Sequence, residues 1–128
     1  MPYSFDDARW PLAVFRIEDS LTAAEEVEFS ECSTRLPERE LRYAVIVDLA
    51  KAGTPSPRFM RLQAKAQKLR YAGIQTHCAG IAFVIRSPMI RGALRAILHL
   101  QSLPCPQVVV ASIEDAQTWT AEKMQDPT

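Results

Sequence analysis

Hydrophobic residues occur along the chain in short continuous runs, separated by longer segments in which they recur every three or four residues. The short runs are rich in β-branched and aromatic residues, which is typical of strands. A run that is continuous rather than alternating is typical of a strand covered on both faces. We therefore predict strands at 10–17, 41–49, 78–85 and 106–111, and Phe5 favours a short leading strand.

Capping signals predict four helices, at about 22–36, 56–72, 87–102 and 112–124. The first opens with Thr22 and Glu25, the spacing of a capping box, in which each side chain bonds the backbone N–H of the other residue. The second and third open with Ser followed by Pro, an N-cap and a first-turn residue with preset φ. Gly73 is expected to end the second helix in the left-handed conformation.

Strands that alternate with helices of this length imply right-handed crossovers and a mostly parallel sheet. We expect one α/β domain over 1–128 in the order βαβαβαβα, with four to five strands and helices on both faces. Its core is expected to span about 5–124, and the tail at 125–128 is expected to fray. Doubly wound sheets usually reverse their winding direction once. A reversal after the first helix would place helices two and three on one face and helices one and four on the other.

Charge is distributed unevenly, although fifteen acidic and fifteen basic side chains give zero formal net charge. Eleven acids lie within 6–48 and four within 114–126, whereas 49–113 holds none. That middle interval carries nine Lys or Arg residues, so its net charge is +9, and the flanks carry six against fifteen acids, or −9. With the expected placement of the helices, this asymmetry predicts a molecule with one basic and one acidic face.

The basic residues of the second and third helices recur every three or four positions, so each set forms one stripe. The predicted partner-binding residues are Arg58, Arg61, Lys65, Lys68, Arg91 and Arg95. A charged stripe is ordinarily a solvated helix face. The lack of acids favours docking of an acidic partner, because surfaces built only for solubility mix both signs.

Two polar residues are candidates for a second kind of site. Asp48 ends a buried strand at the carboxyl edge of the sheet, where α/β proteins bind ligands, so it is a candidate pocket carboxylate. Its alternative role is to cap a turn. Ser56 is first of all an N-cap. A phosphate there would lie at a helix N-terminus near Arg58 and Arg61, which makes Ser56 a candidate phospho-switch.

Motifs for catalysis or cofactor binding are missing. Four scattered glycines exclude a dinucleotide fingerprint and a P-loop. His77 and Cys78 are adjacent, but no second Cys or His cluster lies at zinc spacing. A Ser/His/Asp set drawn from Ser56 or Ser87, His77 and Asp48 lacks the glycines of a nucleophile elbow. We therefore expect no catalytic residue, no cofactor and no metal.

The compartment is inferred from the cysteines and the N-terminus. Three cysteines, an odd number, fit a reducing compartment better than a disulfide framework. No basic region followed by an apolar stretch precedes Trp10, and no apolar run approaches the length of a membrane span. We expect a cytoplasmic protein.

The strand at 10–17, the helix start Leu21-Thr22 and the strand ending Val47-Asp48-Leu49 resemble the SpoIIAA-like branch of STAS domains (sulfate transporter and anti-sigma-factor antagonist). The pattern Glu114-x-Ala116-x-x-Trp119 is similar to the ending of SpoIIAA-like proteins grouped with lipid-binding Sec14-type domains. The resemblance covers about 5–124. It implies a small non-enzymatic α/β module that binds a protein partner or, in some branches, a nucleotide or lipid.

The resemblance also implies a phosphorylated serine at the start of the second helix, whose modification releases a partner kinase. The family's Asp-Ser-Ser/Thr-Gly segment is absent, because Asp48 is followed by Leu-Ala-Lys-Ala-Gly-Thr-Pro-Ser. Only Ser56 could take that part by position. The departure argues against a direct sigma-factor antagonist.

We therefore expect a cytoplasmic regulatory or scaffolding module that binds an acidic protein partner, or a second copy of itself, through the basic face. The alternative is binding of an anionic lipid or membrane headgroup. Nucleic acid is a weaker candidate partner because the sequence pI is about 6.7.

Overall fold

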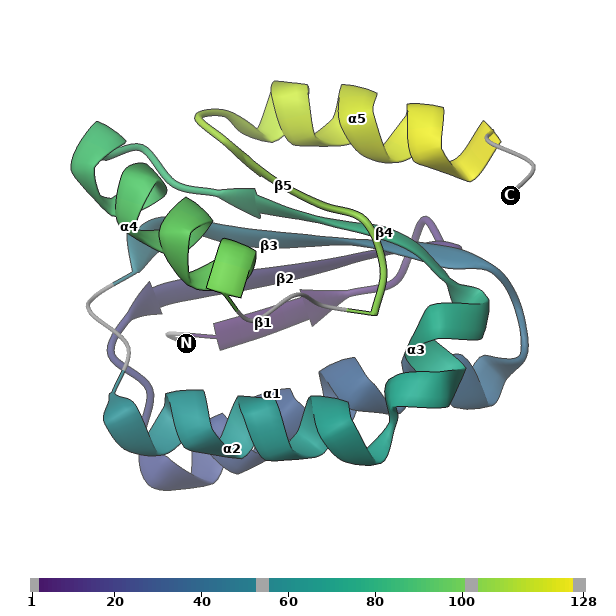
Figure 1. Cartoon of the computed structure of the whole chain (residues 1–128), viewed down its shortest axis with the longest axis horizontal. Helices are drawn as coiled ribbons and strands as arrows, with labels where there is room; N and C mark the ends of the chain where they lie inside the picture. The colour runs from purple at the N-terminus through teal and green to yellow at the C-terminus, as the bar shows by residue number, and fades with distance from the viewer. Residues whose placement is uncertain (1–2, 53–55, 101–103, 126–128) are drawn as a thin grey trace.

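A five-stranded sheet with helices on both faces forms the molecule (Figure 1), as described over 3–52, 56–100 and 104–125 of the computed structural model. The strands are β1 (Tyr3–Asp6), β2 (Leu12–Asp19), β3 (Tyr43–Ala52), β4 (Cys78–Val84) and β5 (Gln107–Val110). The helices are α1 (Ala23–Thr34), α2 (Pro57–Leu69), α3 (Tyr71–His77), α4 (Pro88–Leu100) and α5 (Ile113–Gln125), with a 3-10 turn η1 (Leu36–Arg39).

The strands lie in the sheet in the order of the chain, β1-β2-β3-β4-β5. β1 runs antiparallel to β2, and the other neighbouring pairs are parallel. The prediction of an α/β fold with a mostly parallel sheet is confirmed, and the short leading strand around Phe5 is present as β1. The described helices include none that is long and apolar enough to cross a membrane.

Local capping signals proved reliable. Thr22 Oγ1 accepts from the backbone N–H of Glu25 at 3.2 Å, and Glu25 Oε1 accepts from the N–H of Thr22 at 2.9 Å, so the capping box is confirmed. Ser56 accepts from the N–H of Phe59 at 3.0 Å and caps α2 as predicted.

The predicted end of the second helix at Gly73 is wrong. α2 ends at Leu69, and a separate helix α3 continues from Tyr71 into β4. No described glycine has positive φ. A Cβ on Gly73 would lie 3.0 Å from Cβ of Pro37, so this glycine allows α3 to pack closely against η1 rather than ending a helix.

Three crossover connections place their helices on one face of the sheet. α1 packs along α2 below the sheet in Figure 1, and Phe29 of α1 contacts both Phe15 of β2 and Phe59 of α2. Leu94 of α4 packs near Phe83 on this same face. α5 covers the opposite face, where Ala116 and Trp119 pack over the central strands.

The predicted division of helices is therefore partly wrong: α2 and α4 do share a face, but α1 lies with them and not with α5. The reason is the strand order. A right-handed crossover between parallel strands leaves the sheet on one fixed side, and without a reversal of strand order every crossover uses that side. The basic α2 and the acidic α1 are consequently neighbours.

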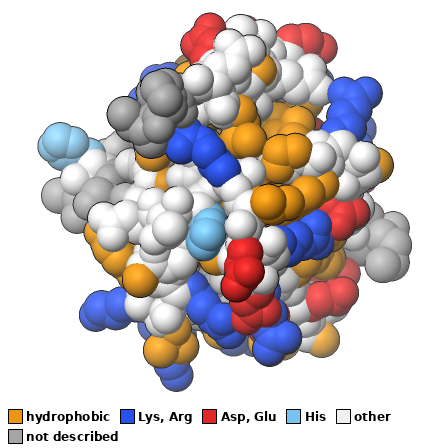
Figure 2. All heavy atoms as spheres, turned by 90° about the vertical axis from the view of Figure 1, so that its right-hand side faces the viewer, with side chains coloured by type: hydrophobic (Ala, Val, Ile, Leu, Met, Phe, Trp, Pro, Cys, Tyr) orange, Lys and Arg blue, Asp and Glu red, His pale blue; other side chains and the backbone are white. Residues whose placement is uncertain are grey.

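The prediction of one basic and one acidic face fails for the same reason. Figure 2 shows the end of the molecule near α3, with the α1 and α2 layer at the lower edge. Lys and Arg side chains gather along that edge and acidic side chains lie beside them to the right. Charges of both signs therefore meet on one face.

Candidate functional site

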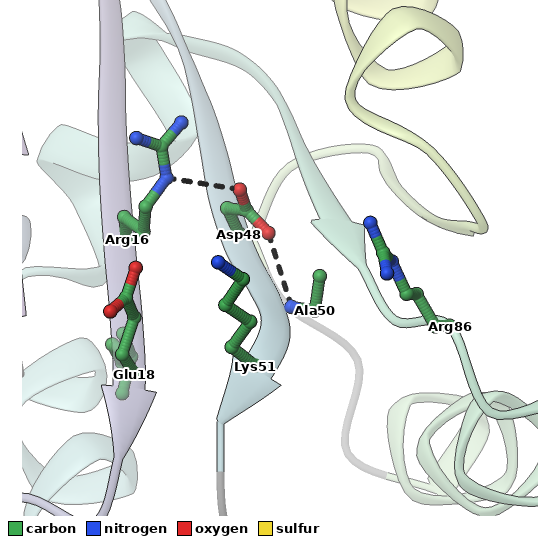
Figure 3. A pocket seen from close by; sticks show the side chains of 7 residues that line it. Arg16, Glu18, Asp48, Ala50, Lys51 and Arg86 are labelled. Carbon is green, nitrogen blue, oxygen red and sulfur yellow. Dashed lines mark hydrogen bonds and ion pairs between the residues drawn. The ribbon is translucent and has the colours of Figure 1, made fainter.

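A cavity of about 220 Å³ lies at the carboxyl ends of β2, β3 and β4. Its lining residues are Arg16, Ile17, Glu18, Asp48, Ala50, Lys51 and Arg86. Figure 3 shows that they come from the two neighbouring strands β2 and β3 and from Arg86, just beyond the end of β4. The site thus stands at the edge where α/β sheets bind ligands.

An ion pair between Arg16 and Asp48 forms one wall of this cavity. The two residues are direct partners in the parallel register of β2 and β3, and Arg16 Nε donates to Asp48 Oδ2 at 3.1 Å. Asp48 Oδ1 accepts from the N–H of Ala50 at 3.1 Å. Both carboxylate oxygens of Asp48 are therefore engaged, while the terminal nitrogens of Arg16 extend away from that pair (Figure 3).

A β-bulge brings Lys51 to the same wall. Arg16 pairs with Asp48 but Glu18 pairs with Lys51, so β3 contains one extra residue between the two pairs. Side chains in a strand alternate between faces, and the extra residue turns Lys51 to the side of Glu18 and Asp48. Figure 3 shows the Lys51 ammonium extending toward the Arg16–Asp48 pair.

The cavity has an excess of positive charge. Three cations, Arg16, Lys51 and Arg86, face two carboxylates, Glu18 and Asp48. In the parts of the chain that the structure describes, ion pairing within the cavity is confined to Arg16 and Asp48. The side chains of Lys51 and Arg86 are exposed at its rim.

A second charged cluster joins the N-termini of α1 and α2. Glu26 of α1 is 3% exposed. Ser56 Oγ donates to Glu26 Oε2 at 2.7 Å, and Arg58 contacts Glu26 Oε1 through Nε at 2.8 Å and Nη2 at 2.7 Å. The hydrogen bond from Ser56, followed by Arg58, holds the pKa of Glu26 below its usual value in spite of burial.

This cluster changes the interpretation of Ser56. The sequence suggested favourable electrostatics for a phosphate there, but the buried Glu26 carboxylate lies directly against the hydroxyl. A phosphate on Ser56 would face that negative charge as well as the Arg58 guanidinium, so Glu26 opposes the attraction that the sequence suggested. Modification of Ser56 itself stays a prediction.

The other predicted partner-binding residues of α2 lie on its outer surface. Arg61, Lys65 and Lys68 are exposed, and α2 contains no acidic residue. Within the described residues, Arg58 is the α2 cation that forms an ion pair. Leu69, which borders this stripe at the end of the helix, is 76% exposed.

The two predicted α4 residues are engaged with the backbone. Arg91 Nη1 donates to the carbonyls of Ile85 at 3.0 Å and Arg86 at 2.8 Å. Arg95 Nη2 donates to the carbonyl of Val109 at 3.0 Å. Both guanidinium groups therefore help to attach α4 to the ends of β4 and β5.

Sequence reasoning placed Asp48 at the carboxyl edge but did not single out Arg16, Lys51 or Arg86 as its neighbours. A signal was present for Arg16, a charged residue next to the carboxyl end of the strand predicted at 10–17. None was available for Lys51, because its direction depends on a bulge. The role of Glu26 was also missed, since its position on α1 resembles that of an ordinary first-turn acid.

The geometry defines a small α/β domain with a charged carboxyl edge. No protein-family model and no curated protein matches the sequence. Among solved structures, the chain is similar to an uncharacterised protein of the DUF3478 family with a SpoIIAA-like fold, from Shewanella loihica PV-4. The match has a TM-score of 0.63 and 14% identity over 92% of this chain and 91% of that one. The protein therefore has a SpoIIAA-like fold, which confirms the resemblance at the level of the fold.

Proposed function

We propose that the protein is a non-enzymatic regulatory or scaffolding module that binds an acidic protein surface through α2. SpoIIAA-like folds are commonly regulatory or binding modules. The observation that supports this proposal most is the exposed stripe of Arg61, Lys65 and Lys68 on a helix without acids. Like charges at this spacing repel each other by a few tenths of a kcal/mol per pair. An acidic partner relieves that repulsion.

Apolar exposure next to the stripe favours a protein partner. Leu69 lies one position after Lys68 and four after Lys65, so it borders the charged stripe. Interfaces combine exposed apolar anchors with Arg, and a solvated helix face has no need of an exposed Leu. A second copy of this chain is one candidate partner, because its acidic α1 would complement the basic stripe of α2 in sign.

Charge reversal tests the proposal. Lys65→Glu with Lys68→Glu should abolish salt-sensitive capture of protein partners by the immobilised domain, and remove any dimer seen by sedimentation velocity. The matched control is Arg9→Glu with Arg35→Glu, two exposed cations outside α2. Both variants should keep melting temperatures close to that of the unmodified protein, since exposed substitutions shift stability by less than about 0.5 kcal/mol each. Equal capture by both variants would refute the role of α2.

Binding to an anionic membrane is the second candidate, and α4 carries the observation that favours it. Met89 is 84% and Ile90 is 54% exposed, three and four positions after the cation Arg86. Apolar side chains next to basic ones suit the boundary of an anionic bilayer. Co-sedimentation with vesicles of phosphatidylcholine, with and without phosphatidylserine, tests this function. Binding that requires phosphatidylserine and is lost in Met89→Ser with Ile90→Ser supports it, and no binding removes it.

A further inference from the structure

The carboxyl-edge cavity has features of a ligand site that are independent of α2. Its volume of about 220 Å³ is below the roughly 300–1,000 Å³ of sites for drug-sized molecules. The cavity therefore suits a single small functional group. Its position at the ends of parallel strands is the usual place for ligands in this architecture.

The excess of positive charge in the cavity favours an anionic ligand. Three cations line the cavity against two carboxylates, and the Arg16–Asp48 pair uses one carboxylate fully. Asp48 binds Nε of Arg16 and so orients the guanidinium, with its two terminal nitrogens on the side away from Asp48 (Figure 3). Such a fork matches two oxygens of a phosphate or carboxylate.

The bulge in β3 adds a second point of positive charge. Regular alternation would direct Lys51 away from the face of Asp48, toward the side of the sheet that α1 and α2 cover. The bulge reverses this, at the cost of a locally disrupted ladder. Bulges that re-aim side chains in this way are over-represented next to binding sites. Arg86 closes the opposite rim (Figure 3).

From these observations we infer that the cavity binds the phosphate group of a small phosphate monoester. A phosphate is favoured over a carboxylate because Arg16, Lys51 and Arg86 together offer more N–H donors than two carboxylate oxygens can use. A diphosphate is disfavoured because no glycine-rich loop offers backbone N–H groups to a second phosphate. In this assignment Arg16 supplies bidentate donors, Lys51 and Arg86 supply charge, and Asp48 is a positioning residue.

The test is a titration of the full chain followed by amide ¹H–¹⁵N NMR at pH 8 and constant ionic strength. Two probes are used, inorganic phosphate and ethyl phosphate. Saturable shifts that centre on the amides of Arg16, Ala50 and Arg86 support the site. Binding of both probes identifies a site for a monoester, whereas binding of inorganic phosphate alone restricts it to the free ion and overturns the monoester assignment.

Substitution makes the test specific. Lys51→Met should weaken binding by about tenfold, equivalent to about 1.4 kcal/mol, and Arg86→Met by a similar factor. The matched control is Arg9→Met, an exposed cation before the start of β2 and outside both proposed sites, which should leave binding unchanged. Shifts that grow linearly without saturation, or equal affinity in Lys51→Met and Arg9→Met, would overturn the proposal. Neither outcome bears on the α2 surface, which is tested separately by charge reversal.

Discussion

Two arginine–carboxylate pairs, one between the helices α1 and α2 and one between the strands β2 and β3, differ in which of their polar atoms remain available. Glu26 with Arg58 is a closed cluster: the carboxylate is buried, and Ser56 and Arg58 occupy both of its oxygens. Asp48 with Arg16 is a more open one: the Asp48 side chain is 13% exposed against 4% for Glu26, and Arg16 keeps two terminal nitrogens for other contacts. The same chemistry joins two helices in the first case and lines a cavity in the second.

The two arginine side chains are similarly exposed, at 52% and 60%, so the difference lies in the surroundings of the carboxylate, which faces a cavity in one pair and the contact between two helices in the other. A buried carboxylate requires all its partners, so their loss destabilises the fold. A pair at a cavity rim contributes little to stability and is free to serve a ligand. Substitutions at the Glu26 cluster should therefore lower the free energy of unfolding, whereas substitutions at the Asp48 pair should mainly weaken ligand binding.

The largest effect is expected at Ser56. Ser56→Asp keeps an N-cap but loses the hydrogen bond to Glu26, worth about 1.5–3 kcal/mol for a charged acceptor, and adds a like charge worth at least about 1 kcal/mol. We expect a loss of about 3–4 kcal/mol in the free energy of unfolding at pH 7. Ser56→Ala, the control, should lose less because it adds no charge. Urea unfolding followed by Trp fluorescence measures both, and a smaller loss for Asp than for Ala would contradict the closed cluster.

A matched pair of arginine substitutions should give the next largest difference. Arg58→Met leaves buried Glu26 with Ser56 alone, and we expect a loss of about 2–3 kcal/mol, because Arg58 is itself partly hydrated. Arg16→Met should cost less than about 1 kcal/mol, the range of exposed pairs. The same urea unfolding experiment compares them. Equal losses would show that the two clusters do not differ in the way described.

The smallest expected effect is on the pH dependence of stability. The pKa of Glu26 is lower in the folded protein than in the unfolded chain, where it is about 4.3. Its contribution is therefore complete above that value and is lost as the pH falls through the folded-state pKa. Urea midpoints between pH 6 and pH 3 should fall less steeply for Glu26→Gln than for the unmodified protein. Parallel curves would exclude this contribution.

The fold class was predictable because local signals agreed with one another. The continuous apolar run Ala-Val-Ile-Val within 41–49, the capping box at Thr22 and the Ser-Pro helix starts each marked an element that the structure contains. The predicted stop at Gly73 was wrong because a glycine near a helix end has two uses. A left-handed turn and a close approach to Pro37 both require a glycine, so the sequence does not distinguish them.

The arrangement of charge was not predictable, since it depends on strand order, which no local pattern encodes. An assumed reversal of winding separated α1 from α2, whereas the actual order brings Glu26 into contact with Arg58. The cavity was only partly predictable for a similar reason. Asp48 was predicted from its position at the end of a strand. The direction of the Lys51 side chain depends on a β-bulge, and no residue in the sequence indicates that bulge.

The strand order also bears on how the domain assembles during synthesis. Each parallel strand pairs with the one that precedes it in the chain, so a nascent polypeptide can add strands at one growing edge without inserting a late segment between earlier ones. Each addition still has to close a crossover, because the parallel partners lie 26 to 36 positions apart in the chain. The loop-closure entropy slows each step, so the unpaired edge of the last strand added is the part of the nascent domain that is open to aggregation for longest.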